Sequence, residues 1–184
     1  MQTLQVGLSS WIIQDGNYGE FEVGREYRFA LEFYAPDLVL DSSPVEVYAL
    51  APLGDAKYKG VGSVIFGSDK AWVIDVGVPA YRDERLPARA RVGSRVTGEI
   101  YLGIEPFFYF EGLSALPGMP NLYRQWFITR ILLEITPWLE TVDEAGRTLR
   151  ARDESKVGYV EVDATDAWNH DDGHGHYLLE CEQR

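Results

Sequence analysis

Turn-forming residues recur along the whole chain at intervals too short for long helices. Examples are Asp15-Gly16, Ala35-Pro36, Gly67-Ser68-Asp69 and Asp172-Gly173. The runs between these turns are short and rich in Val, Ile, Tyr, Phe and Trp, which favour strands. Many short strands separated by Gly and Pro turns are typical of a β-barrel or a β-sandwich. We therefore expect an all-β fold with few helices.

Alternation of apolar and polar residues marks the individual strands. In segment 27–34 every second residue is aromatic or aliphatic, whereas Arg28 and Glu32 fall on the other face. This period of two predicts a strand with one buried face. Further strands are expected at 45–50, 61–66, 71–76 and 96–104, with 61–76 forming a hairpin and an aromatic extension following at 107–110.

Segment 121–138 has two interpretations. Asn121 could cap a helix, but the segment is rich in aromatic and β-branched residues such as Phe127, Ile128 and Ile131, which favour a strand. We expect a long strand. Further on, 158–164 and 176–182 are expected to pair as a final hairpin around a histidine-rich loop.

The order of elements in YKGVGSVIFGSDKAWVIDVGV and the following residues, 58–104, is strand, turn, strand, loop, strand. This order resembles the first three strands of an OB-fold barrel. The segment AWNHDDGHGHYLLECE is similar to uncharacterised bacterial proteins that carry such a barrel. The resemblance implies a partly open antiparallel, OB-like core over about 58–135. Strands from both ends would extend it into one domain covering 1–184. It implies no functional residue.

The histidine-rich loop is a candidate metal site. It contains His170, His174 and His176 together with Asp172. In an extended chain, Asp172, His174 and His176 would share a face. Imidazoles that converge on one ion are what zinc, nickel or copper require.

A polar turn is the interpretation we favour for this loop. Tyr177, Leu179 and Cys181 alternate in the strand that follows and form its more apolar face, so His176 is expected on the solvated side. The Asp-Gly and Gly-His-Gly spacing also suits a flexible turn. We therefore predict no bound metal.

A basic island occupies segment 81–95 of this acidic chain. Its candidate binding residues are Tyr81, Arg82, Arg85, Arg89, Arg91 and Arg95. Beside an OB-like barrel, such a loop could contact phosphates and stack a base. Alternatively, the arginines are solvated and pair with the protein's own carboxylates.

Catalytic patterns are weak. Glu99, Glu105 and Glu111 share one face of an extended chain, but a rise of about 3.3 Å per residue places neighbours roughly 20 Å apart. The two carboxylates of a glycosidase pair must lie about 5–10 Å apart.

The Ser9-Ser10 and Ser42-Ser43 pairs lack a glycine elbow, although spacing alone does not exclude a triad with a distant histidine. No phosphate-binding loop is found, and we expect no cofactor.

The net charge of −12 favours a basic protein partner. It opposes binding to nucleic acid or to an anionic membrane. A single cysteine suits a reducing cytoplasm, and no signal peptide or membrane span is evident. We predict a non-enzymatic cytoplasmic protein that acts through protein–protein contact, as an immunity or antitoxin-type protein or an accessory subunit. An OB-type nucleic-acid binder and a small enzyme with an unrecognised site are the alternatives. The oligomeric state is left open.

Overall fold

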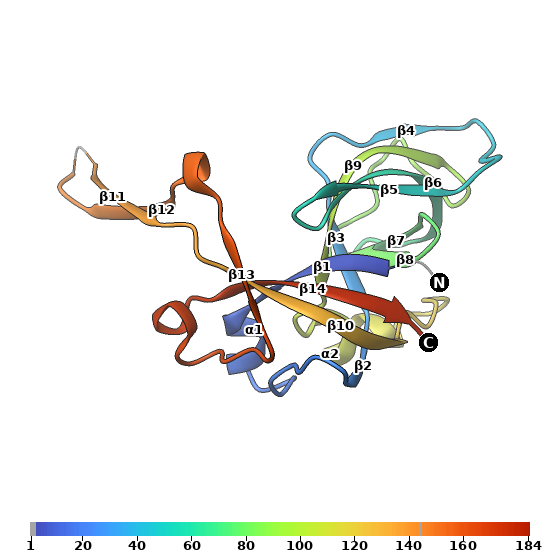
Figure 1. The fold of residues 1–184 in the computed structure, drawn as a ribbon. Helices are drawn as coiled ribbons and strands as arrows, with labels where there is room; N and C mark the ends of the chain where they lie inside the picture. The colour runs from blue at the N-terminus through green and yellow to red at the C-terminus, as the bar shows by residue number, and fades with distance from the viewer. Residues whose placement is uncertain (1–2, 144) are drawn as a thin grey trace.

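The computed structural model describes residues 3–143 and 145–184 of the chain. Within them, one sheet contains twelve strands and a second sheet contains two, which confirms the all-β expectation (Figure 1). The strands of the first sheet are β1 (Thr3–Ser9), β2 (Glu26–Phe29), β3 (Leu31–Tyr34), β4 (Val39–Asp41), β5 (Ala49–Gly54), β6 (Lys57–Gly67), β7 (Trp72–Asp75), β8 (Pro79–Arg82), β9 (Arg95–Ile104), β10 (Arg124–Glu134), β13 (Tyr159–Val162) and β14 (His176–Gln183). The second sheet pairs β11 (Trp138–Val142) with β12 (Thr148–Arg152). Helical elements are short, namely α1 (Ser10–Gln14), α2 (Phe108–Glu111), η1 (Leu113–Ala115), η2 (Glu154–Lys156) and η3 (His170–Gly173).

Five strands close into a barrel. β9, β3, β8, β7 and β6 are neighbours in that order, and β6 pairs again with β9, so the ring is complete. Closure removes the unpaired edges that an open sheet would expose. The expected hairpin at 61–76 is confirmed as β6 and β7. The strands of the ring come from residues 31–34 and 57–104. Strand β10, which falls within the expected core of about 58–135, lies outside the ring.

A second layer continues from the barrel through β1. β1 touches β9 at Gly7 and pairs along its whole length with β14, which in turn pairs with β10. The other edge of β10 is shared by β2 at one end and β13 at the other. Segment 121–138 therefore contains a long strand, as predicted.

One hydrophobic cluster contains buried residues from both the barrel and the second layer, and β14 shows how alternation determines which residues are buried. Tyr177, Leu179 and Cys181 are completely buried, as the sequence pattern predicts. They pack with Trp126 and Ile131 of β10 in one hydrophobic cluster. Burial raises the pKa of the Cys181 thiol to about 12, so this cysteine behaves as a small apolar residue.

Several strand predictions are wrong in detail. Segments 158–164 and 176–182 do not form a hairpin, because β10 lies between β13 and β14 and pairs with both. The predicted strand at 45–50 is displaced to β5. Segment 27–34 is two strands that separate at Ala30, since β2 joins β10 and β3 joins the barrel.

The predicted aromatic extension at 107–110 is also wrong. The chain leaves the sheet at Pro106 and turns into α2. Proline lacks the amide hydrogen that a strand needs to continue its ladder. The backbone amide of Tyr109 instead donates to the Glu105 carboxylate at 3.3 Å.

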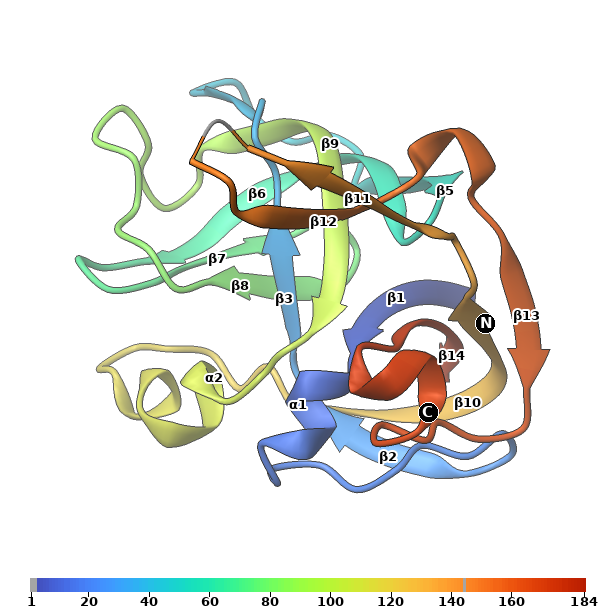
Figure 2. The ribbon, with the colours of Figure 1, turned by 90° about the vertical axis from the view of Figure 1, so that its left-hand side faces the viewer.

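The pair β11–β12, which we call the arm, projects from the second layer between β10 and β13. It extends away from the barrel in Figure 1 and is seen across the barrel in Figure 2. Every residue of β11 is exposed, as are all of β12 except Arg152. Among the described residues, no helix is both long enough and apolar enough to cross a membrane.

Candidate functional site

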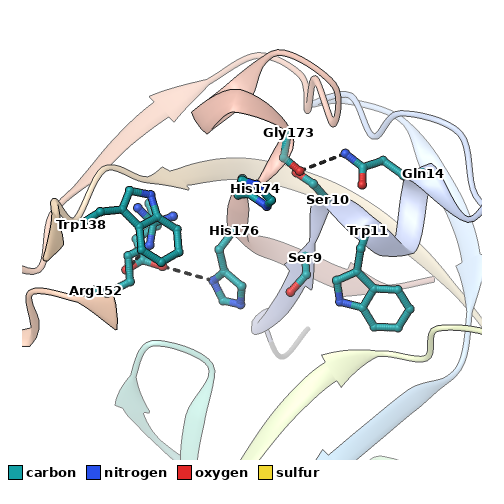
Figure 3. A pocket seen from close by; sticks show the side chains of 11 residues that line it. Ser9, Ser10, Trp11, Gln14, Trp138, Arg152, Gly173, His174 and His176 are labelled. Atoms are coloured by element: carbon teal, nitrogen blue, oxygen red, sulfur yellow. Dashed lines mark hydrogen bonds and ion pairs between the residues drawn. The ribbon is translucent and has the colours of Figure 1, made fainter. Parts of the chain in front are cut away.

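A cavity of about 450 Å³ lies where the arm joins the second layer. Its walls come from the junction of β1 with α1, the start of β14, the end of β10 and the base of the arm. The lining residues are Ser9, Ser10, Trp11, Gln14, Glu134, Trp138, Arg152, Gly173, His174, Gly175 and His176. Most of them are labelled in Figure 3.

Three polar residues of this cavity stand in one row across the sheet. Ser9 of β1 lies directly opposite His176 of β14. Leu133 of β10 lies opposite Tyr177, so the next residue, Glu134, adjoins His176 from the other side. Side chains of directly opposed residues share a face and have Cβ atoms about 4.5–5.5 Å apart. The fold therefore aligns a hydroxyl, an imidazole and a carboxylate.

The imidazole of His176 is enclosed between two partners. Its Nδ1 lies 3.6 Å from a Glu134 carboxylate oxygen, and its Nε2 lies 3.5 Å from the Tyr101 hydroxyl. Burial lowers the pKa of His176, the Glu134 carboxylate opposes this shift, and the Arg152 guanidinium adds to it. A neutral imidazole at neutral pH is a proton acceptor.

The phenol of Tyr101 stays protonated beside that imidazole. Burial raises its pKa to about 12, and the carboxylates of Glu32 and Glu134 add to the effect. A protonated phenol remains a hydrogen-bond donor, so the side of the imidazole away from Glu134 faces a donor rather than an anion.

Arg152 fixes the base of the arm against the second layer. It donates to the Thr136 carbonyl at 2.7 Å and to the Asp171 carboxylate at 2.5 Å. Its guanidinium lies 3.9 Å from the centre of the Trp138 ring, and that indole donates to Asp171 at 3.1 Å. Charge-assisted bonds of this kind are about twice as strong as neutral ones. The cavity thus has one wall that depends on the docking of the arm.

The structure separates the residues of the candidate histidine site. His170 Nδ1 lies 3.0 Å from the Tyr177 hydroxyl, His174 is exposed at the cavity rim, and Asp172 is exposed in the turn. Asp171 and Asp172 adopt left-handed backbone angles, with φ of 51° and 53°. Over 3–143 and 145–184, no group of three His, Cys, Asp or Glu residues is placed to hold a metal ion.

His176 does not have the solvated position that the sequence predicts. It lies on the polar face of β14, but the arm and α1 enclose that face, and its side chain is only 32% exposed. Alternation identifies the face of a strand and cannot show what covers it.

The basic island is only partly exposed. Tyr81 is completely buried and lies against Tyr109 in the second hydrophobic cluster, so it is not placed to stack on a base. Arg82 pairs with Glu84 at 2.9 Å. Arg95 is half-buried, whereas Arg85, Arg89 and Arg91 are exposed.

Glu105, one of three glutamates expected to share a face of an extended chain, is buried. Its carboxylate accepts hydrogen bonds of 3.4 Å from the hydroxyls of Tyr18, Tyr81 and Tyr123. Burial raises the pKa of Glu105, and these donors partly offset the rise. The tyrosines satisfy a carboxylate that would otherwise be costly to bury.

Sequence reasoning missed Glu134, Arg152 and the role of Ser9. The pairing of β14 with β1 and β10 brings Ser9 and Glu134 beside His176, and the contact with Asp171 brings Arg152 of the arm to the same cavity. Comparison of the chain with protein-family models, with curated proteins and with solved structures found no match.

Proposed function

We propose that this protein binds another protein through its arm, and that the partner is basic. The observation that carries the proposal is an apolar face on the arm. The residues of that face are Leu139, Thr141, Leu149 and Ala151, and the two leucines are 48% and 50% exposed. Exposed apolar patches of this kind mark interaction sites.

The orientation of the arm supports the proposal. Trp138 and Arg152 are opposed in the ladder and contact Asp171, so their face is turned toward the second layer. Side chains alternate along a strand, and the face that holds Leu139 and Leu149 therefore points away from the protein.

A two-stranded sheet is also a natural place for a further strand. An isolated pair of strands is marginally stable in water. Each outer edge offers backbone donors and acceptors that an extended segment of a partner can pair with. Binding would then bury the leucines and complete the hydrogen bonding of one edge.

Charge indicates the kind of partner. The arm with its turn is neutral overall, since Glu140, Asp143 and Glu144 balance Arg147, Arg150 and Arg152, while the whole chain carries −12. An apolar contact at the arm and long-range attraction from the acidic surface together favour a basic protein. An immunity or antitoxin-type protein or an accessory subunit would fit this description.

Nucleic-acid binding has weaker support. The OB-like relation of segment 58–104 stays a prediction, and a binder of that type uses aromatic side chains as stacking platforms. Tyr81, the aromatic residue of the basic island, is in the core. The exposed arginines Arg85, Arg89 and Arg91 are then left to contact phosphates without such a platform.

The test combines crosslinking and reconstitution. A photoreactive benzoylphenylalanine at position 149 is introduced in cells of the source organism, with the same residue at Val92 as control, because Val92 is equally apolar and 59% exposed. The protein crosslinked only from position 149 is then purified and titrated against the wild type, Leu149→Asp and Val92→Asp by calorimetry.

We expect a stoichiometric complex that Leu149→Asp weakens at least about tenfold, or about 1.4 kcal/mol. Val92→Asp should bind as the wild type does. Equal affinities for the two variants would remove the arm from the interface. A crosslink between two copies of this chain would make the partner a second copy and overturn the basic-partner proposal.

A further inference from the structure

We propose that the cavity at the base of the arm is an ester-hydrolysis site with Ser9 as nucleophile and His176 as general base. Glu134 is the positioning residue that orients the imidazole. This activity does not depend on partner binding by the arm.

The first argument is the row across the sheet. Ser9 and His176 are directly opposed, which brings their Cβ atoms to about 4.5–5.5 Å on the same face. Figure 3 shows both side chains directed into the same cavity. The Glu134 carboxylate lies 3.6 Å from Nδ1 of His176, just beyond hydrogen-bond distance, and a serine hydroxyl beside an imidazole with a carboxylate behind it is the arrangement that activates a serine.

The second argument concerns the proton on the imidazole. Nδ1 faces the Glu134 carboxylate at 3.6 Å, so we assign the ring proton to Nδ1. The lone pair is then on Nε2, on the side away from Glu134. In the free site the Tyr101 hydroxyl lies 3.5 Å from Nε2, a long contact that a serine proton can replace.

The third argument concerns the substrate class. Trp11 and Trp138 lie on opposite sides of His176 and line the cavity, with exposed fractions of 49% and 38% (Figure 3). Exposed indoles bind aromatic and aliphatic groups. A cavity of about 450 Å³ suits a small ligand. The substrate is therefore a small carboxylic ester with an apolar or aromatic group.

The reaction has two balanced steps. The Ser9 oxygen bonds to the ester carbonyl carbon, and its proton passes to Nε2 of His176. The bond to the leaving alkoxide breaks, and that oxygen takes the proton from Nε2. Water then attacks the acyl-serine, again losing a proton to His176. The carboxylic acid leaves, and the Ser9 oxygen recovers its proton.

A fluorophosphonate probe tests the nucleophile directly. The serine oxygen displaces fluoride from phosphorus, and peptide mass spectrometry identifies the labelled residue. We expect the label on Ser9, its loss in Ser9→Ala, and its persistence in Ser43→Ala, a control serine that is exposed. His176→Gln should lower the labelling rate about 100-fold or more, as expected for loss of a general base.

The positioning role of Glu134 has its own readout. The carboxylate raises the pKa of His176 against the effect of burial. Glu134→Gln should therefore move the midpoint of the pH–labelling profile to lower pH as well as reduce the rate. A residue with a merely structural role would reduce the rate without moving the midpoint.

Ser9→Cys gives a second test that does not need His176→Gln to fold. Its thiol should react with iodoacetamide at pH 7 faster than that of Ser43→Cys, because a neighbouring imidazole promotes the thiolate. Native Cys181 is completely buried and provides a low background.

The outcomes separate the two proposals. Leu149→Asp should lose partner binding and keep full labelling of Ser9. Labelling of another serine, labelling that is unchanged in folded His176→Gln, or equal reactivity of the two cysteine variants would each overturn the hydrolase proposal while leaving the arm proposal intact.

Discussion

The phenol of Tyr101 lies directly over Gly7. A Cβ atom at position 7 would lie 1.5 Å from the Tyr101 oxygen, so the tyrosine can reach His176 only because residue 7 has no side chain. Gly7 is also the residue through which β1 contacts β9 of the barrel. Gly7 thus connects the two layers and leaves the space in which the Tyr101 phenol reaches the candidate site.

Gly7→Ala should therefore displace Tyr101 and destabilise the fold. Overpacking of this kind costs about 1–3 kcal/mol. Chemical denaturation measures the loss, and Gly19→Ala is the control, because a Cβ at position 19 meets no atom within 4 Å. Equal stability of the two variants would mean that Tyr101 does not occupy this place.

The apolar residues of β14 and of the arm should differ in their contribution to the free energy of unfolding. Leu179 is completely buried and Leu139 is 48% exposed, although both occupy strands. Leu179→Ala should lower the free energy of unfolding by about 2–5 kcal/mol. Leu139→Ala should change it by less than about 0.5 kcal/mol. If Leu139→Ala costs as much, the arm is packed rather than free for a partner.

The face of β14 shows what the sequence can reveal. Alternation placed Tyr177, Leu179 and Cys181 in the core because a strand with one buried face has a period of two. The same pattern placed His176 on the polar face correctly. It could not reveal that the arm encloses that face, because the contact of Arg152 with Asp171 is formed by side chains from separate elements.

Strand pairing was harder to predict from the sequence than the buried face of each strand. Segments close in sequence were expected to pair, but β10 intervenes between β13 and β14. The pairing of β14 with β1 on one side and with β10 on the other aligns Ser9, His176 and Glu134. A one-residue slip in either pairing would move a whole side-chain set to the other face. The candidate site is thus a product of long-range register, which local patterns do not encode.

Docking of the arm should depend on the pair Arg152 and Asp171. The side chains are 17% and 24% exposed, so solvent screens their interaction only in part. A double-mutant cycle with Arg152→Ala and Asp171→Ala should give a coupling energy of about 1 kcal/mol or more, above the range of most exposed pairs. Hydrogen exchange in segment 138–152 should rise in each single variant.

The pair Arg150 and Glu140, on the exposed part of the arm, is the control. Their side chains are 59% and 56% exposed, and their coupling should be smaller. Equal coupling in both cycles would show that Arg152 does not anchor the arm.

Ionisation of Glu32 should make the stability of the folded protein depend on pH. Burial raises the pKa of this carboxyl from 4.5 to about 7, and the nearby carboxylates of Asp83 and Glu105 add to the effect. Between pH 4.5 and pH 7 the folded protein keeps a proton that the unfolded chain has released. The stabilising contribution is therefore complete below the unfolded pKa and is lost as pH rises through the folded one.

Glu32→Gln keeps a neutral side chain at every pH and removes this loss. The variant should match the wild type near pH 4, below the unfolded pKa, and exceed its stability by up to about 3 kcal/mol near pH 8, since each pKa unit corresponds to about 1.4 kcal/mol. Urea denaturation across this range measures both curves. Glu99→Gln, on the exposed side of β9, should follow the wild type. Because His176 titrates in both proteins, its contribution cancels in the difference between the curves, which reports Glu32 together with its coupling to Asp83 and Glu105. Parallel curves for wild type and Glu32→Gln would show that this carboxyl ionises normally in the folded protein.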